Sequence, residues 1–169
     1  FLPQGNYPLK NLHTVIRALP AVRQRFPGAT LHIAGWAPLD RGPLLRPIIG
    51  RMFPYKLYCK QLAAQLGVAD ALHYTGPLDA ASMRQAYLEG DVFLLPSSCE
   101  NSPNSLGEAM LLGMPCVASN AGGIPDMLAD GREGLIYGES QDADALARCL
   151  LQVLAAPDGG TALGQAARA

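Results

Sequence analysis

The chain has 169 residues, of which 49% are hydrophobic and 16% charged, and this is enough for one globular domain with a core. Thirteen basic and fourteen acidic side chains leave a net charge of −1, which argues against nucleic acid as a partner. No apolar run reaches the ~18 residues that a membrane span needs. The four cysteines form no C-x-x-C pair, so reduced thiols in a cytoplasmic protein are expected rather than a disulfide framework or a metal site.

Strands and helices alternate along the chain. The chain starts at Phe1 without an initiator Met, within what reads as a strand, so we expect a piece of a longer protein. Short apolar runs predict strands at 2–5, 31–35, 72–76, 91–95, 116–119 and 134–137. Apolar residues spaced for one helical face predict helices at 11–25, 55–66, 80–88, 103–113 and 142–155. This alternation is typical of an α/β fold with a parallel, Rossmann-like sheet covered by helices on both faces.

Two segments do not fit the alternation. Residues 36–54 form an irregular, proline-rich stretch with several arginines. A surface loop or short hairpin insertion explains this stretch, and a mobile basic loop beside a ligand or a membrane surface is the alternative. The tail at 157–169 is rich in Gly and Ala and is expected to be frayed and flexible.

Two glutamates follow the predicted strand 91–95. Glu100 lies in the loop after the strand, and Glu108 lies in the next helix. Ser102 is the expected N-cap of that helix, and Pro103 suits its first position. Glu in the first turns of a helix is also common for electrostatic reasons alone, so the spacing by itself does not establish a site.

The start of the helix between the two glutamates is suited to phosphate. Its first backbone N–H groups have no partner within a helix and would point at open space; they belong to Asn104, Ser105 and Leu106. Glu108 would lie roughly 7–8 Å further along the axis. One acid thus precedes the phosphate position and one follows it, which suits a nucleotide sugar with its sugar and its ribose on opposite sides of a diphosphate.

Other distinctive residues also follow predicted strands. Lys10, Gly35, Gly76, Glu100 and the pair Gly122-Gly123 all stand just after one. Because the carboxyl ends of parallel strands meet at one edge of a sheet, where such folds bind ligands, we expect these positions to lie together. The two glycines allow a close backbone approach or a positive φ.

The order and spacing of these motifs resemble a known family. The motifs are Lys10-Asn11-Leu12, Ala34-Gly35, Tyr74-Thr75-Gly76, Glu100 with seven residues before Glu108-Ala109-Met110, Gly113-Met114-Pro115-Cys116-Val117-Ala118-Ser119, Gly122-Gly123-Ile124-Pro125, Asp130-Gly131 and Gly134-Leu135. Over about residues 1–155 the chain resembles the carboxyl-terminal, donor-binding domain of family-4 (group 1) retaining glycosyltransferases with the two-domain GT-B fold. The sequence around Gln4 and around Glu100 is most similar to that of bacterial capsule and exopolysaccharide transferases.

The resemblance implies a role for each matching residue. Lys10 and Glu100 would be the catalytic pair, with Lys10 on the diphosphate and Glu100 on the donor-sugar hydroxyls. Glu108 would accept both ribose hydroxyls, and the N–H groups of Asn104, Ser105 and Leu106 would bind phosphate. Gly76 and Leu78 would lie against the base, and Gly122 and Gly123 would shape the site. No Asp-x-Asp motif occurs, so neither a metal nor a cofactor is expected beyond a UDP- or GDP-sugar donor.

The chain departs from the family pattern at one important position. Many members carry an Arg shortly before the Lys, whereas this chain has Gln4 there and no Arg before Arg17. Phosphate stabilisation would then depend on Lys10 and the helix N-terminus, or on a residue from outside this chain. Asp126 also stands where these enzymes usually have Glu after the glycine turn.

The resemblance implies a hexosyltransferase of polysaccharide biosynthesis. Residues 1–156 would be the nucleotide-sugar-binding half, and an amino-terminal domain outside this chain would bind a glycan or lipid-linked acceptor, so the isolated piece should be inactive. The full-length protein would be cytoplasmic, and peripheral attachment to the inner face of the plasma membrane stays open. A non-catalytic nucleotide-binding partner and a GT-B phosphorylase or sucrose-type synthase are the alternatives; a Rossmann dinucleotide domain is disfavoured because no G-x-G-x-x-G follows the first strand.

Overall fold

The computed structural model of the chain describes residues 1–5, 7–37 and 53–169. The predicted irregular stretch at 36–54 therefore lies, apart from its two ends, outside the described residues. Among the residues that are described, no helix has both the length and the hydropathy required to cross a membrane.

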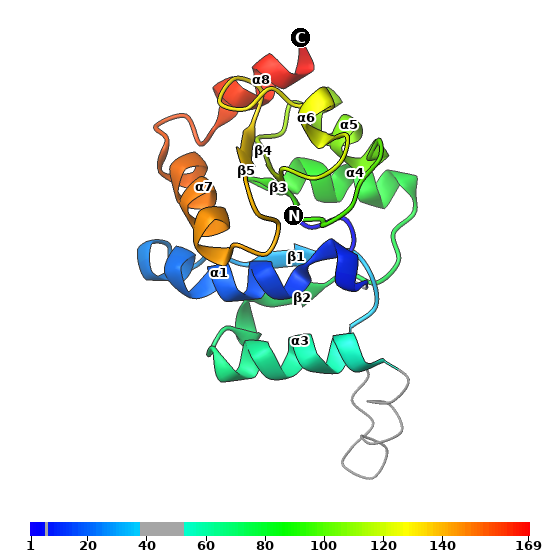
Figure 1. Cartoon of the computed structure of the whole chain (residues 1–169), viewed down its shortest axis with the longest axis vertical. Coiled ribbons are helices and arrows are strands. Elements are labelled where there is room, and N and C mark those ends of the chain that lie inside the picture. Colours follow the sequence, from blue (N-terminus) through cyan, green and yellow to red (C-terminus); the bar gives the residue numbers. More distant parts are fainter. Residues whose placement is uncertain (6, 38–52) are drawn as a thin grey trace.

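The strands pair in parallel in two groups. Strand β1 (Leu31–Ile33) pairs with β2 (Leu72–Tyr74), and β3 (Phe93–Leu95), β4 (Cys116–Ser119) and β5 (Leu135–Tyr137) form a three-stranded group with β4 in the middle. Each strand lies within the range predicted for it and is equal to it or shorter. The two groups lie one above the other in Figure 1, with the N-terminus between them.

The first two residues connect these groups into one sheet. Leu2 forms a parallel bridge with Ile33, and its N–H donates to the His32 carbonyl at 2.9 Å. On the other side, the Leu94 N–H donates to the Phe1 carbonyl at 2.8 Å. The order across the sheet is therefore β2, β1, residues 1–2, β3, β4 and β5, and of the strand predicted at 2–5 only Leu2 forms a bridge.

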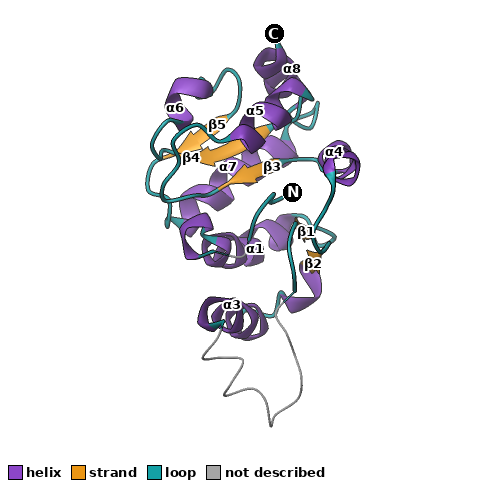
Figure 2. Ribbon diagram, turned by 90° about the vertical axis from the view of Figure 1, so that its right-hand side faces the viewer, coloured by secondary structure: helices purple, strands orange, loops and turns teal. Residues whose placement is uncertain are grey.

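Helices cover both faces of this sheet, as predicted. The helices are α1 (Leu12–Arg25), α3 (Pro54–Gln65), α4 (Ala80–Glu89), α5 (Asn104–Leu111), α6 (Ile124–Met127) and α7 (Ala143–Ala155), with short 3-10 turns η1 (Pro8–Lys10) and η2 (Ala69–Ala71). Residues of α1, α3 and α7 form one hydrophobic core, and residues of α4, α5 and α6 form the other. In Figure 2 the strands β3, β4 and β5 lie between α5 and α6 on one side and α7 and α1 on the other.

Alternation along the central strands supplies both cores. Successive side chains of a strand point to opposite faces of the sheet. Leu94 and Val117 accordingly pack in the core of α1 and α7, whereas Phe93, Cys116 and Ala118 pack in the core of α4 and α5. Because both faces are buried, the strands have continuous apolar runs, and these runs are what made them predictable.

The tail is not frayed as predicted but contains a further helix, α8 (Thr161–Arg168). The Asp158 carboxylate accepts hydrogen bonds from the N–H groups of Gly160 and Ala162, at 3.1 and 2.8 Å, and these bonds cap the helix start. Gly164 is buried, and a Cβ built on it would lie 2.0 Å from the Gly113 carbonyl oxygen. The α8 backbone therefore approaches the loop after α5 at a distance that only glycine permits.

Replacing Gly164 with alanine should therefore detach α8. The added methyl group cannot fit 2.0 Å from the Gly113 oxygen, so the helix must move away from the loop. We expect a melting temperature lower by roughly 2–8 °C, for a loss of about 1–2 kcal/mol, and faster cleavage of the tail by a broad-specificity protease. Exposed Gln165, changed to alanine in the same helix, is the control. A Gly164→Ala protein as stable and protease-resistant as the control would contradict this packing.

Candidate functional site

Helix α5 begins one residue later than predicted. Pro103 is the N-cap rather than the first helical residue, with φ −72° and ψ 106°, and it contributes no side-chain cap. The predicted N-cap Ser102 is exposed, and its hydroxyl contacts the Met127 sulfur at 3.8 Å instead. The φ of Pro103 would suit a helix, but its extended ψ keeps this residue in the preceding loop, so helical geometry starts at Asn104.

This shift changes which N–H groups are available at the helix start. Leu106 donates its N–H to the Pro103 carbonyl at 3.0 Å, so the prediction that its N–H is unpaired is wrong. Asn104 and Ser105 precede the first bond of the helix, and neither N–H donates a hydrogen bond within the described part of the chain. Two backbone donors, rather than three, therefore stand at the positive end of the α5 dipole.

A cavity of about 240 Å³ lies in front of this helix start, at the carboxyl edge of the sheet. It is lined by residues from the first loop, from α4, from the end of β3 and from α5: Leu2, Pro3, Gln4, Lys10, Met83, Tyr87, Leu95, Ser97, Asn104, Ser105 and Glu108. Four of the predicted site residues, Lys10, Asn104, Ser105 and Glu108, thus meet at one cavity. Gln4, where the resemblance led us to expect an Arg, lines it too.

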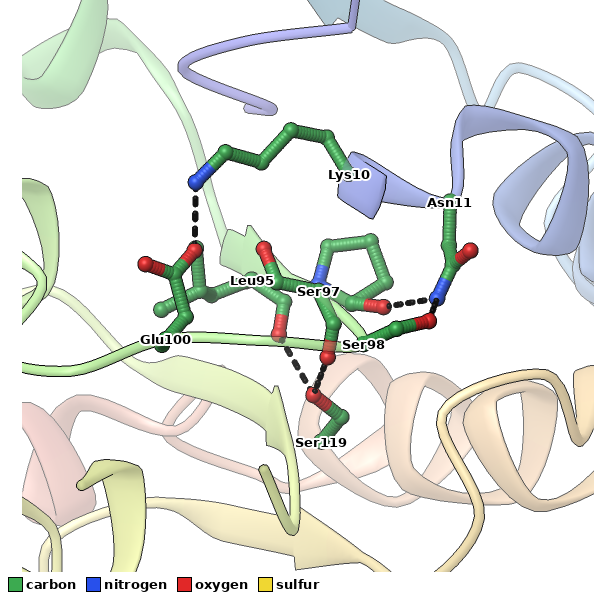
Figure 3. Close-up of polar contacts among 8 residues, drawn as sticks. Lys10, Asn11, Leu95, Ser97, Ser98, Glu100 and Ser119 are labelled. Atoms are coloured by element: carbon green, nitrogen blue, oxygen red, sulfur yellow. Dashed lines mark hydrogen bonds and ion pairs between the residues drawn. The ribbon is translucent and has the colours of Figure 1, made fainter. Parts of the chain in front are cut away.

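Glu100 joins the site through an ion pair. The Lys10 Nζ lies 2.5 Å from the Glu100 Oε1, with 23% of the lysine side chain and 10% of the glutamate side chain exposed. Figure 3 shows the Lys10 side chain extended across Ser97 toward Glu100, so the two predicted catalytic residues lie together although they are 90 positions apart. The cation at the cavity wall therefore already has a carboxylate partner.

Buried Asn11 holds Lys10 against this loop. Its backbone has φ 48° and ψ 38°, the left-handed conformation that Asn tolerates better than most residues. Its side-chain amide donates to the Pro96 carbonyl at 2.8 Å and to the Ser98 Oγ at 2.7 Å. The Ser119 hydroxyl donates to the Ser97 carbonyl at 2.5 Å, from the end of β4 (Figure 3). The residues between β3 and Glu100 are thus fixed from both sides.

Gly122 and Gly123 act on the backbone of the Glu100 loop rather than on the cavity. A Cβ on Gly122 would lie 1.7 Å from the Glu100 carbonyl oxygen, and a Cβ on Gly123 would lie 1.9 Å from the Asn101 carbonyl oxygen. The Gly123 N–H donates to the Glu100 carbonyl at 3.2 Å, and Gly122 has φ +54°. The predicted shaping of the site by this pair therefore takes the form of a backbone contact that sets the position of Glu100.

Tyr87 is a site residue that the sequence did not reveal. Its hydroxyl donates to the Glu108 Oε2 at 2.9 Å, and only 2% of the residue is exposed. Burial, followed by the hydrogen bond and the charge of Glu108, raises the pKa of Tyr87, so its hydroxyl stays protonated at neutral pH. Tyr87 fits the apolar face of α4, so no local signal distinguishes it from an ordinary core residue.

The structure does not bring the two predicted base-contacting residues to the cavity. Gly76 has φ +76° and exchanges backbone hydrogen bonds with Gly35, at 2.9 and 3.1 Å, at the ends of β1 and β2. Leu78 is partly buried against the core of α4, α5 and α6. Of this neighbourhood, only Met83 lines the cavity, as an apolar wall that the sequence analysis did not single out.

The arrangement suits a ligand that combines phosphate with hydroxyl groups. The two N–H groups and Lys10 can neutralise a phosphate, because backbone donors at a helix start and a cation both favour anions. Ionised Glu108 and Glu100 can accept hydrogen bonds from hydroxyls on either side. Among the described residues, no group of three or more His, Cys, Asp and Glu side chains is placed to hold a metal ion.

Comparison with known proteins identifies the family. A family model for "Glycosyl transferases group 1" matches residues 2–156. The GDP-mannose-dependent alpha-(1-6)-phosphatidylinositol monomannoside mannosyltransferase of Mycolicibacterium smegmatis is 30% identical over 168 residues, which cover 95% of this chain and 40% of that protein. The chain thus spans well under half the length of this curated relative.

Solved structures agree with the sequence match. Sucrose-phosphate synthase from Thermosynechococcus elongatus superposes with a TM-score of 0.77 and 25% identity, over 99% of this chain and 39% of that one. The carboxyl-terminal domain of a group 1 family glycosyl transferase from Francisella tularensis, at 18% identity, gives a TM-score of 0.79 over 99% of this chain and 80% of that domain. The fold is that of one half of a GT-B glycosyltransferase, and the chain belongs to the group 1 glycosyltransferases.

Proposed function

We propose that this chain is the donor-binding half of a retaining hexosyltransferase that uses a nucleoside-diphosphate sugar. The observation that carries the proposal is the cavity that joins Lys10, the first two N–H groups of α5 and Glu108. A diphosphate at the helix start would bring the ribose within reach of Glu108 and the sugar within reach of Glu100. The mycobacterial relative is GDP-mannose-dependent, which makes GDP the first nucleotide to test.

The residues of the cavity would act on the leaving group. As the bond between the sugar and the diphosphate breaks, negative charge builds on the phosphate oxygens. Lys10 and the N–H groups of Asn104 and Ser105 would stabilise this charge from fixed positions, which is electrostatic preorganisation. Glu100 would orient the sugar by accepting hydrogen bonds from its hydroxyls, and it is not assigned the role of a glycosidase nucleophile.

The acceptor would be a glycan or a lipid-linked sugar in bacterial capsule or exopolysaccharide synthesis, bound by a domain outside this chain. The full-length enzyme would act in the cytoplasm, at the inner face of the plasma membrane. The 25% identity to sucrose-phosphate synthase supports a second candidate, which keeps the donor site and transfers to a small soluble sugar. With the full-length protein and its donor, transfer to lipid-linked or to soluble acceptors separates the two, and the anomeric configuration of the product tests retention.

Replacing Glu108 with alanine should remove most of the nucleotide affinity. The ribose would lose a charged acceptor, and a hydrogen bond to a charged group contributes about 1.5–3 kcal/mol, or roughly a 10- to 100-fold change in the dissociation constant. Calorimetric titration with GDP, UDP and ADP, first without and then with Mg²⁺, measures this change. Glu89→Ala is the control, because Glu89 is an exposed helical glutamate that does not line the cavity. Equal affinities of the Glu108→Ala and wild-type chains would overturn the proposed function.

A further inference from the structure

The hydrogen bond from Tyr87 to Glu108 has no role in the transfer chemistry proposed above. Glu108 is exposed on α5, so its side chain would otherwise be free to sample several rotamers. The Tyr87 hydroxyl reaches the Glu108 Oε2 from α4 at 2.9 Å. The carboxylate is therefore held at one oxygen by a residue from a different helix.

The Tyr87 ring itself has little freedom. Its ring centroid lies 5.3 Å from that of Phe1 in an edge-to-face contact, and 5.8 Å from that of Phe93. Only 2% of the residue is exposed, and it belongs to the core beneath α4 and α5. A hydroxyl on such a ring has a fixed position, so it can fix the group that it contacts.

The hydrogen-bond inventory leaves room for a ligand. The hydroxyl has a single hydrogen, and the Glu108 oxygen at 2.9 Å is a nearer acceptor than the Ser105 carbonyl at 3.4 Å. An ionised carboxylate has about four acceptor positions, of which Tyr87 uses one. Oε1 and the remaining lone pair of Oε2 can therefore receive two neighbouring hydroxyl groups, the number that a ribose presents.

We propose that Tyr87 is a positioning residue that makes the site select ribose nucleotides over 2′-deoxyribose nucleotides by holding the Glu108 carboxylate for both ribose hydroxyls. This inference rests on the proposed function, because it takes Glu108 as the ribose acceptor. A carboxylate fixed at the spacing of two hydroxyls loses a partner when one hydroxyl is missing. A carboxylate free to rotate can settle on the single hydroxyl that remains and discriminates less.

The test compares GDP with 2′-deoxy-GDP in calorimetric titrations of the wild-type and Tyr87→Phe chains. The change keeps the ring and its contacts and removes only the hydroxyl. We expect the wild-type chain to prefer GDP by about 10-fold or more and Tyr87→Phe to reduce that preference by about 3- to 10-fold, mostly through weaker GDP binding. Tyr137→Phe is the matched control, since Tyr137 is 3% exposed and its hydroxyl bonds the Ser140 carbonyl outside the cavity lining.

The outcomes separate the inference from the proposed function. A GDP preference that Tyr87→Phe leaves unchanged would overturn the inference. If the affinities for GDP and 2′-deoxy-GDP both fall by the same factor, Tyr87 is a packing residue, and if neither falls, its hydroxyl has no effect on the site. No GDP or UDP binding by the wild-type chain would overturn the proposed function itself. If Tyr87→Phe folds poorly, the wild-type titrations alone still test the inference, because a site that binds GDP and 2′-deoxy-GDP with equal affinity makes no such selection and would overturn it.

Discussion

Replacing Gly122 with alanine should lower stability and weaken nucleotide binding, although the residue does not line the cavity. Its Cβ would lie 1.7 Å from the Glu100 carbonyl oxygen, and its φ of +54° is unfavourable for any residue with a Cβ. The backbone of Glu100 must move away, taking with it the partner of Lys10. We expect a loss of about 3 kcal/mol or more in the free energy of unfolding and a melting temperature lower by roughly 6–12 °C.

Gly131 provides a control that separates backbone strain from the clash. It has a similar φ of +72°, but a Cβ built on it would meet no atom within 4 Å. Gly131→Ala should therefore cost only the ~1–2 kcal/mol of the left-handed conformation and leave nucleotide binding intact. Thermal melts and GDP titrations of both variants make the comparison. If Gly122→Ala and Gly131→Ala have similar melting temperatures and similar GDP affinities, the close contact of Gly122 with Glu100 contributes nothing beyond the strain of a positive φ.

Replacing Lys10 with methionine should have two separable effects. The first is on stability, because Glu100, with 10% of its side chain exposed, loses the cation that lies 2.5 Å away. Removing one partner of a fully buried ion pair costs about 3–5 kcal/mol of stability. Because 23% of the Lys10 side chain is exposed and water screens the pair, we expect a smaller loss here, of roughly 2 kcal/mol. The second effect is on binding, because the loss of a charged contact to phosphate should lower the affinity for GDP by about 10- to 100-fold.

The double variant Lys10→Met with Glu100→Gln distinguishes these effects. A neutral amide needs no cation, so the melting temperature should recover toward the wild-type value, whereas GDP affinity should stay low. GDP carries no sugar, so a role of Glu100 toward the sugar does not enter this measurement. Lys56→Met, which removes a cation that does not line the cavity, is the control. If the double variant binds GDP as tightly as the wild-type chain does, Lys10 does not bind the phosphate.

The fold was predictable wherever the chain has apolar runs or helical periodicity. The strands at 93–95 and 116–119 lie within buried runs, and α7 has regularly spaced apolar residues, so all three were located within two residues. The tail was misjudged because its composition indicates disorder. Its helix depends on the cap from Asp158 and on the close contact of Gly164 with Gly113, which a local reading does not weigh.

The site was predictable in its residues but not in its contacts. Lys10 and Glu100 follow strands that are neighbours in a parallel sheet, so their proximity follows from topology, but their direct pairing does not. The start of α5 was displaced by one residue because both Ser102 and Pro103 suit a helix start, and only the extended ψ of Pro103 decides between them. The bond from Tyr87 joins α4 to α5 across the core, and nothing in the spacing of those helices indicates it.

The position of Phe1 and Leu2 has a consequence for truncation. End residues are usually the ones that a domain can lose at little cost. Here they stand in the interior of the sheet, hydrogen-bonded to His32 on one side and to Leu94 on the other. Deleting them would divide the sheet into β1–β2 and β3–β4–β5 and expose unpaired edges along both pieces. The first residues of this chain are therefore among its least dispensable.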